Sequence, residues 1–223
     1  GGFNVKNKTC WDYELYLKFL ISGASAALCD GKWHHLAIVR NSGTTKCYWD
    51  GVEKASASDS TNYNGTGGNL NIAYESAAGY YLNGYMSNFR IVKGTAVYTA
   101  AFTPPTAPLT AITNTSLLTC QSNRFIDNSS NAFAITVNGS PSVQRFSPFA
   151  PTAAYSAATI GGSGYFDGSG DYLSVADNSN LRFGTNAFTI QGWIYRNASG
   201  AAHSIIAKGG ASTGFVLQVT STN

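Results

Sequence analysis

Residues 30–52 read DGKWHHLAIVRNSGTTKCYWDGV and combine two alternating segments with two turn signals. Apolar and polar residues alternate on both sides of Asn41-Ser42-Gly43, and Asp50-Gly51 closes the stretch. Such alternation is typical of strands with one buried face, and Asp-Gly is favoured in tight hairpin turns. The stretch therefore predicts an antiparallel sheet. The residues expected on its inward side are Trp33, Leu36, Ile38, Cys47 and Trp49.

The segments WHHLAIVR and YWDGV within this stretch resemble the central strands of laminin-G-like, concanavalin A-like lectin domains. Residues 81–105, YLNGYMSNFRIVKGTAVYTAAFTPP, are similar to the closing strand of that family. Residues 163–196, SGYFDGSGDYLSVADNSNLRFGTNAFTIQGWIYR, are similar to its opening strands. The resemblance implies an all-β, concanavalin A-like jelly-roll sandwich of two antiparallel sheets. Because this fold carries many binding functions, the resemblance implies no particular ligand.

The order of these motifs is circularly permuted relative to a simple family member. We expect residues 1–103 to form the C-terminal half of a laminin-G-like sandwich and residues 117–223 its N-terminal half. The Pro/Thr-rich connector 104–116 could span at most about 45 Å when extended. Gly2-Phe3 also echoes Gly214-Phe215, in agreement with the permuted order. The halves could complete each other within one chain, or with neighbouring copies in a tandem array.

The composition limits the partners of the chain. Among 223 residues only 11% are charged, the net charge is +3, and no segment concentrates Lys or Arg, so we expect no nucleic-acid partner. No apolar stretch is long enough to predict a membrane span. The start at Gly1, without an initiator Met, favours a piece of a longer or processed polypeptide. The four cysteines could form two disulfides, but buried free thiols are favoured because no C-x-x-C pair occurs.

The alternation and turn signals predict short strands and almost no helix. A short helical turn is expected near residues 179–183. Strands are expected near residues 2–6, 13–21, 33–40, 45–50, 69–74, 82–92, 116–120, 133–137, 163–166, 171–175, 187–195, 203–207 and 214–220.

The acidic residues do not form the pattern of a glycoside hydrolase. Retaining hydrolysis needs two carboxylates a few ångströms apart, as on one strand face in an E-x-D-x-E sequence. Glu53 and Glu75 have no acidic partner at that spacing, and Asp12 with Glu14 lacks a third carboxylate. We therefore expect a protein that is not an enzyme.

The histidines do not predict a metal site either. His34 and His35 are neighbours and should point to opposite faces of a strand, and His203 is alone.

Two features remain as candidate sites. The segment FDGSGDYL, with Asp167 and Asp171, resembles a calcium loop. We favour a hairpin turn, because Asp and Gly are common turn residues. Some relatives bind Ca²⁺ at the sandwich rim, so Asp167, Asp171 and Asp50 are the candidate ligands of a possible Ca²⁺ ion, while no other cofactor is expected.

Sugar binding combines aromatic rings with amide and hydroxyl groups on loops of a rigid scaffold. The probable loops at residues 59–64 and 78–81 offer this mixture, although Tyr80 and Tyr81 could instead be strand residues whose rings pack. Trp33, Trp49 and Trp193 are expected in the core. The candidate ligand-binding residues are Asp59, Asn62, Tyr63, Asn64, Tyr80 and Tyr81.

The sequence motifs resemble laminin-G-like repeats of large phage virion and marine-bacterial surface proteins. This resemblance implies a non-catalytic, lectin-like structural or adhesive module of a tail fibre, decoration or adhesin, at an extracellular or virion surface. Its expected partners are other copies of itself or neighbouring repeats, together with cell-surface glycans. The alternative is a carbohydrate-active enzyme or its accessory carbohydrate-binding module.

Overall fold

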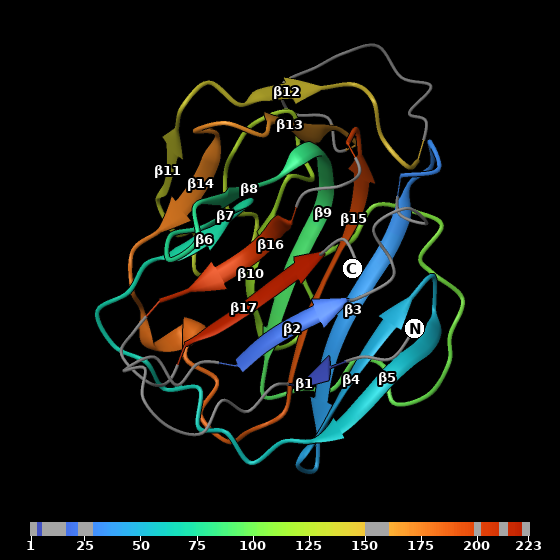
Figure 1. Cartoon of the computed structure of the whole chain (residues 1–223), viewed down its shortest axis with the longest axis vertical. Coiled ribbons are helices and arrows are strands. Elements are labelled where there is room, and N and C mark those ends of the chain that lie inside the picture. The colour runs from blue at the N-terminus through green and yellow to red at the C-terminus, as the bar shows by residue number, and fades with distance from the viewer. Residues whose placement is uncertain are drawn as a thin grey trace.

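Two β-sheets packed as layers form the body of the molecule in the computed structural model (Figure 1). The structure describes residues 4–5, 17–21, 29–149, 161–198, 202–209 and 214–219. In Figure 1 the strands β17 and β2 of one sheet cross in front of β9 and β15 of the other. Among the described pairs, all are antiparallel except β17 with β2. The predicted all-β sandwich of two antiparallel sheets is thereby confirmed.

The strand order of each sheet is as follows. Sheet A runs β1 (Asn4–Val5), β2 (Leu17–Ile21), β17 (Phe215–Val219), β16 (His203–Lys208), β6 (Leu70–Ile72), β14 (Tyr172–Val175) and β11 (Ile135–Asn138). Sheet B runs β12 (Ser142–Gln144), β13 (Ser163–Asp167), β9 (Asn83–Lys93), β15 (Phe188–Arg196), β3 (His34–Asn41), β4 (Thr44–Trp49) and β5 (Val52–Ser58), and β10 (Thr115–Thr119) also pairs with β9. A small hairpin, β7 (Tyr74–Glu75) and β8 (Tyr80–Tyr81), and the 3-10 turn η1 (Ser179–Leu181) complete the described elements.

Both sheets contain strands from the two halves of the chain, and strands of one half pair directly with strands of the other. In sheet B, Ile190 of β15 lies opposite Ile38 of β3 on one side and Ile91 of β9 on the other. In sheet A, Ile72 of β6 lies between Ile206 of β16 and Leu173 of β14. The described residues therefore close one sandwich within a single chain.

The interior is built from the alternating apolar residues of both sheets. Leu36, Ile38 and Cys47 are buried in it, as the alternation predicted, together with Phe89 and Phe166. Burying one such side chain contributes about 1.5–3 kcal/mol relative to leaving it in water.

Two of the tryptophans that were predicted to face the core lie elsewhere. Trp49 is half-buried and packs against the core, but Trp33 and Trp193 lie on the outer face of sheet B. In β15 the inward residues are Ile190 and Ile194, so Trp193 alternates outward. The prediction that Trp33 and Trp193 belong to the core is therefore wrong.

The Asp50-Gly51 turn confirms its prediction in detail. Both residues have positive φ, 48° and 77°, as a tight hairpin turn of this kind requires. A Cβ atom at Gly51 would lie 1.7 Å from the carbonyl oxygen of Phe102, so the close approach of this chain segment also requires glycine.

Several strands were missed or shortened. The predicted strands omit β5, β8 and β12, and the single strand predicted at 69–74 spans β6 and the first residue of β7. Strand β5 reads VEKASAS, and Glu, Lys, Ala and Ser are weak strand formers, so its pairing with β4 at the sheet edge determines its conformation. The helical turn near residue 179 is confirmed by η1. Of the strands predicted at 2–6 and 13–21, only residues 4–5 and 17–21 lie within the described residues.

Residues 97–110 cross the outer face of sheet B, and a polar network lies beneath them. With the Gln191 amide oxygen accepting from Arg90 Nη2 (2.7 Å) and Nε (3.2 Å), its NH₂ group donates to the Tyr98 hydroxyl (2.8 Å) and to His35 Nε2 (3.2 Å). The Tyr98 ring stacks on Phe102 at 3.6 Å, and Arg90 Nη1 donates to the Thr110 carbonyl (2.8 Å). This network fixes His35 as a buried, neutral acceptor.

Two histidines and two cysteines are held in their neutral forms by burial. Burial lowers the pKa of His35 and of His203 to about 4, and His203 Nδ1 accepts from the Asn83 amide (3.0 Å). Burial raises the pKa of the Cys47 and Cys120 thiols to about 12, and neither forms a disulfide. These two cysteines are the predicted buried free thiols, whereas Cys10 lies outside the described residues.

The neutral histidines predict acid sensitivity. Between about pH 6.5 and pH 4 the unfolded chain binds a proton at His35 and at His203 that the folded chain does not bind. The free energy of unfolding should therefore fall as the pH falls through this window. His203→Asn, which keeps an acceptor for the Asn83 amide, should make the decline shallower in chemical denaturation measured from pH 7 to pH 4.5. An unchanged slope in this variant would contradict the assignment.

Candidate ligand-binding site

The loop of residues 59–68 is anchored by a buried carboxylate. Asp59 Oδ2 accepts from the Thr45 hydroxyl (2.6 Å) and the Tyr63 hydroxyl (2.9 Å), and Oδ1 accepts from the Thr61 amide (3.0 Å). Arg40 lies beside them, with Nε 3.9 Å from Asp59 Oδ2 and Nη2 donating to the Asp59 carbonyl (2.7 Å). Burial, together with the nearby Asp59 carboxylate, raises the pKa of the Tyr63 phenol.

Asp59 and Tyr63 were predicted to contact a ligand, and this prediction is wrong: both side chains stabilise the loop from within the protein. Both side chains are enclosed, and their polar groups are used within the protein. Asn62 and Asn64 remain exposed on the same loop. The sequence identified the loop, but it could not show that alternate residues of the loop point into the interior.

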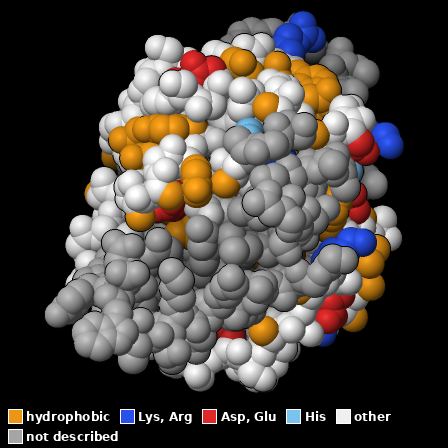
Figure 2. Space-filling view, viewed as in Figure 1, with side chains coloured by type: hydrophobic (Ala, Val, Ile, Leu, Met, Phe, Trp, Pro, Cys, Tyr) orange, Lys and Arg blue, Asp and Glu red, His pale blue; other side chains and the backbone are white. Residues whose placement is uncertain are grey.

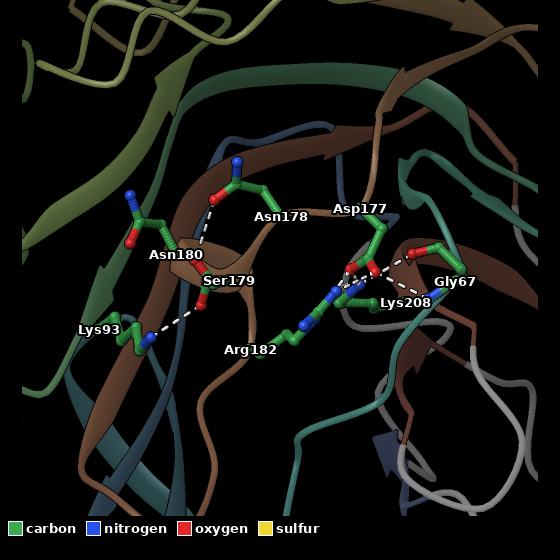
Figure 3. Close-up of polar contacts among 9 residues, drawn as sticks. Gly67, Lys93, Asp177, Asn178, Ser179, Asn180, Arg182 and Lys208 are labelled. Carbon is green, nitrogen blue, oxygen red and sulfur yellow. Dashed lines mark hydrogen bonds and ion pairs between the residues drawn. The ribbon is translucent and has the colours of Figure 1, made fainter.

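A second anchor joins this loop to the segment after β14 (Figure 3). Asp177 accepts hydrogen bonds from Arg182 Nη2, from Lys208 Nζ (2.7 Å) and from the Gly67 amide (2.7 Å). Lys208 Nζ also donates to the Gly68 carbonyl (2.8 Å). The hydrogen bonds from Arg182, Lys208 and the Gly67 amide hold the pKa of the Asp177 carboxyl well below its ordinary value. Three chain segments distant in sequence are thereby fixed to one carboxylate.

The two anchored segments form an edge rich in amide side chains, which we call the amide rim: Asn62, Asn64, Asn180 and Asn186. All four side chains are exposed. The Tyr63 amide donates to the Gly184 carbonyl (2.9 Å), and Asn180 Nδ2 donates to Asn131 Oδ1 (2.9 Å). The rim is thus a row of hydrogen-bonding groups on a well-anchored backbone.

A group of three tyrosines lies on the outer face of sheet A. The Tyr74 and Tyr81 rings are stacked, with centroids 4.5 Å apart and planes 19° apart, and the Tyr172 ring lies 4.6 Å from Tyr74. All three are half-buried. In β14, Leu173 and Val175 point into the core, so Tyr172 and Ser174 point outward. We call this group, with the polar residues beside it, the tyrosine face.

The polar residues beside the three rings are uncharged. Asn138 lies opposite Tyr172 on the neighbouring strand, and its Nδ2 donates to the Ser174 hydroxyl (3.1 Å). Asn71 lies opposite Ser174 on the other side. Figure 2 shows hydrophobic side chains over this part of the sheet, surrounded mostly by backbone and uncharged side-chain atoms. Rings bordered by amides and hydroxyls can bind a neutral polar molecule that has apolar faces.

Glu75, the acidic residue nearest these rings in sequence, is used by the protein itself. Its carboxylate accepts from the Ala77 amide (2.5 Å), the Ala78 amide (3.1 Å) and Gln218 Nε2 (3.2 Å). It therefore holds the β7–β8 hairpin in place. Tyr80 lies opposite Glu75 in that hairpin and is half-buried, and Tyr81 joins the tyrosine face.

The three candidate calcium ligands do not lie together. Asp50 accepts from the His35 amide (2.8 Å) and contacts His34 Nδ1 (2.7 Å). Asp171 Oδ1 accepts from the Ser140 amide (2.6 Å), and Asp167 Oδ1 accepts from the Ser169 amide (2.7 Å) as in an ordinary turn. Across the described part of the chain, no three His, Cys, Asp or Glu side chains are grouped to hold a metal ion. The three carboxylates therefore do not offer Ca²⁺ the six to eight oxygens of one site.

Two residues of the tyrosine face, Tyr74 and Tyr172, were not among the predicted site residues. The alternation in the segment DYLSV could have identified Tyr172 as an outward residue, because the apolar residues Leu173 and Val175 occupy the inward positions of the same strand. No sequence signal could have shown that the hairpin after β6 brings Tyr81 onto Tyr74.

The comparisons with known proteins agree with the fold. Residues 4–100 match a laminin-G family model described as the concanavalin A-like lectin/glucanases superfamily, which confirms the family resemblance. No curated protein and no solved structure matches the chain. No helix within the described ranges is long and apolar enough to cross a membrane.

The Asp177 anchor gives a stability prediction. Only 2% of the Lys208 side chain is exposed, so Asp177→Asn leaves a buried ammonium group without its carboxylate. The free energy of unfolding should fall by about 2 kcal/mol. The control is Glu53→Gln, which breaks the half-exposed pair with Lys46 (2.9 Å) and should change stability far less. Equal losses in urea denaturation would contradict the anchoring role of Asp177.

Proposed function

We propose that this chain, whose residues 4–100 match the model of the concanavalin A-like lectin/glucanases superfamily, is a non-catalytic carbohydrate-binding and adhesive module. The observation that carries the proposal is the tyrosine face, where Tyr74, Tyr81 and Tyr172 form a half-exposed aromatic surface between uncharged amides and hydroxyls.

The chemistry of sugars fits this surface. A pyranose ring presents C–H groups on its faces and hydroxyl groups at its edge. Aromatic rings pack on the first, and amide and hydroxyl side chains such as Asn71 and Asn138 exchange hydrogen bonds with the second. The absence of charge among these residues favours neutral saccharides over acidic ones. The amide rim offers further hydrogen-bonding groups for a larger glycan.

The two described glutamates support binding without hydrolysis. Glu53 pairs with Lys46 on the edge of sheet B, and Glu75 is enclosed by its own hairpin. Within the described residues neither glutamate is in contact with a second carboxylate, and retaining hydrolysis needs such a pair. The glucanase alternative is kept as an outcome of the test below.

We further propose that the module acts outside the cell, on a cell surface or a virion, where copies lie beside one another. The low content of charged residues, 11%, supports this part because it reduces the desolvation cost of repeated contacts. A tail-fibre, decoration or adhesin role follows only from the resemblance of the sequence motifs.

The tyrosine face is tested by Tyr172→Ala on an array of neutral di- and trisaccharides. Removing the ring should lower the affinity for the retained saccharides about tenfold, because the stacking surface is lost. Val137→Ala, an exposed apolar change on the neighbouring strand, is the matched control and should bind as the parent does.

A reducing-end assay on the same saccharides distinguishes binding from catalysis. We expect no product. Released product would support the glucanase alternative, and undiminished binding by Tyr172→Ala would remove the tyrosine face from the proposal.

A further inference from the structure

The sequence contains three Asn-Gly pairs, which begin at Asn64, Asn83 and Asn138. In such a pair the side-chain amide carbon of asparagine can be attacked by the backbone nitrogen of the next residue, because glycine has no side chain to obstruct the approach. The attack requires the asparagine side chain and the following peptide group to turn toward each other. In a folded protein, the hydrogen bonds and contacts that hold a pair therefore decide how fast it reacts.

The pair at Asn83 lies within sheet B. The Asn83 backbone amide donates to His203 Nδ1 (3.0 Å), and Gly84 lies opposite Phe166 of β13 on one side and Arg196 of β15 on the other. The peptide group that would have to turn is thus part of a sheet with a paired strand on each side. Reaction at this pair requires these strands to separate locally.

The pair at Asn138 lies at the end of β11, where both of its parts are held. Asn138 Nδ2 donates to the Ser174 hydroxyl (3.1 Å) and to the Thr136 carbonyl (3.3 Å). A Cβ atom at Gly139 would lie 2.4 Å from Asp171 Oδ1, so the turn packs closely against this carboxylate. The side-chain amide and the following peptide group cannot approach each other without breaking these contacts.

The pair at Asn64 lies outside the strands, on the loop of residues 59–68. The Asn64 side chain is exposed and belongs to the amide rim. Its backbone amide donates to the Asn62 carbonyl (2.9 Å), the one hydrogen bond that joins Asn64 to the other described residues. Of the three pairs, only this one combines an exposed asparagine with a backbone segment outside the sheets.

We infer that Asn64 is the site at which the folded protein deamidates spontaneously. The Gly65 backbone nitrogen loses its proton and bonds to Cγ of Asn64, and the side-chain nitrogen leaves as ammonia, which yields a five-membered succinimide ring. Water then opens the ring at one of its two carbonyl carbons, so that position 64 becomes aspartate or isoaspartate. Water is the only co-reactant and no saccharide is needed, so the inference does not rest on the proposed function.

Both products add a negative charge to the amide rim, but only isoaspartate changes the backbone. It lengthens the chain by one carbon atom between two fixed points of the loop. The Tyr63 amide donates to the Gly184 carbonyl (2.9 Å), and the Gly67 amide donates to Asp177 Oδ2 (2.7 Å). Because residues 64–66 alone separate these two hydrogen bonds, we expect isoaspartate to weaken the bond from Gly67 to the Asp177 anchor.

The site is tested by incubating the full chain in mildly alkaline buffer, once folded and once in concentrated urea. Peptide mapping by mass spectrometry then gives the rate of reaction at each of the three pairs. In the folded chain Asn64 should react at least about tenfold faster than Asn83 and Asn138, because those two need local opening. In urea the three rates should converge, since only the common dipeptide remains. Asn64→Gln, whose longer side chain does not form the five-membered ring, is the matched control and should abolish the product of the folded chain.

Two results would overturn the inference. One is a folded chain in which Asn83 or Asn138 reacts as fast as Asn64. The other is an Asn64 that reacts far more slowly in the folded chain than in urea, because the fold would then protect this pair. Neither result depends on saccharide binding, so a failure of this inference and a failure of the proposed function are separate observations.

Hydrogen exchange tests the consequence for the Asp177 anchor. The isoaspartate form, separated by chromatography, is compared with Asn64→Asp, which has the same charge and an unchanged backbone. The Gly67 amide should exchange several times faster in the isoaspartate form. Equal exchange in the two forms would show that the loop accommodates the added carbon atom, and would overturn the expected effect on the anchor.

Discussion

Strand β15 is hydrogen-bonded along most of its length to β3 on one side and to β9 on the other. It comes from the second half of the chain, and both of its neighbours come from the first. Without β15, neither half has a continuous sheet B, and the inward residues Ile38 and Ile91 lose the side chain of Ile190 that lies between them. Every other feature of the molecule depends on this pairing, because it defines which faces point inward and which outward.

The two outer faces that result are chemically different. On sheet A the tyrosine face is bordered by Asn71, Asn138 and Ser174, all uncharged. On sheet B residues 97–110 cross the outer face and enclose the His35–Gln191–Arg90 network. The Asp59 and Asp177 anchors keep the rim loops in place.

The sequence predicted the fold better than the site. Alternation in residues 30–52 identified Leu36, Ile38 and Cys47 as core residues, because period-two patterns report the buried face directly. It misplaced Trp33 and Trp193, which were assigned to inward strand positions. Trp33 precedes β3 and is out of phase with the inward residues Leu36 and Ile38, and Trp193 alternates with the inward residue Ile194. The composition of β5 did not predict a strand, because its extended conformation comes from its pairing with β4 and not from its own residues.

The candidate site needed tertiary information that no single segment contains. Asp59 and Tyr63 read as loop ligands, yet Arg40 and Thr45 from neighbouring strands enclose them. Tyr81 was identified from its local composition, but its partners Tyr74 and Tyr172 join it only through the packing of a hairpin on β14.

The pairing of the two halves is tested most directly by cutting the chain between them. A specific protease site inserted between Thr106 and Ala107, both exposed, allows cleavage of the folded protein. After cleavage, the fragments should sediment as one particle with an unchanged far-UV circular dichroism spectrum, and should separate only in denaturant. Fragments that separate in buffer, each retaining its strand signal, would contradict a sandwich shared by both halves.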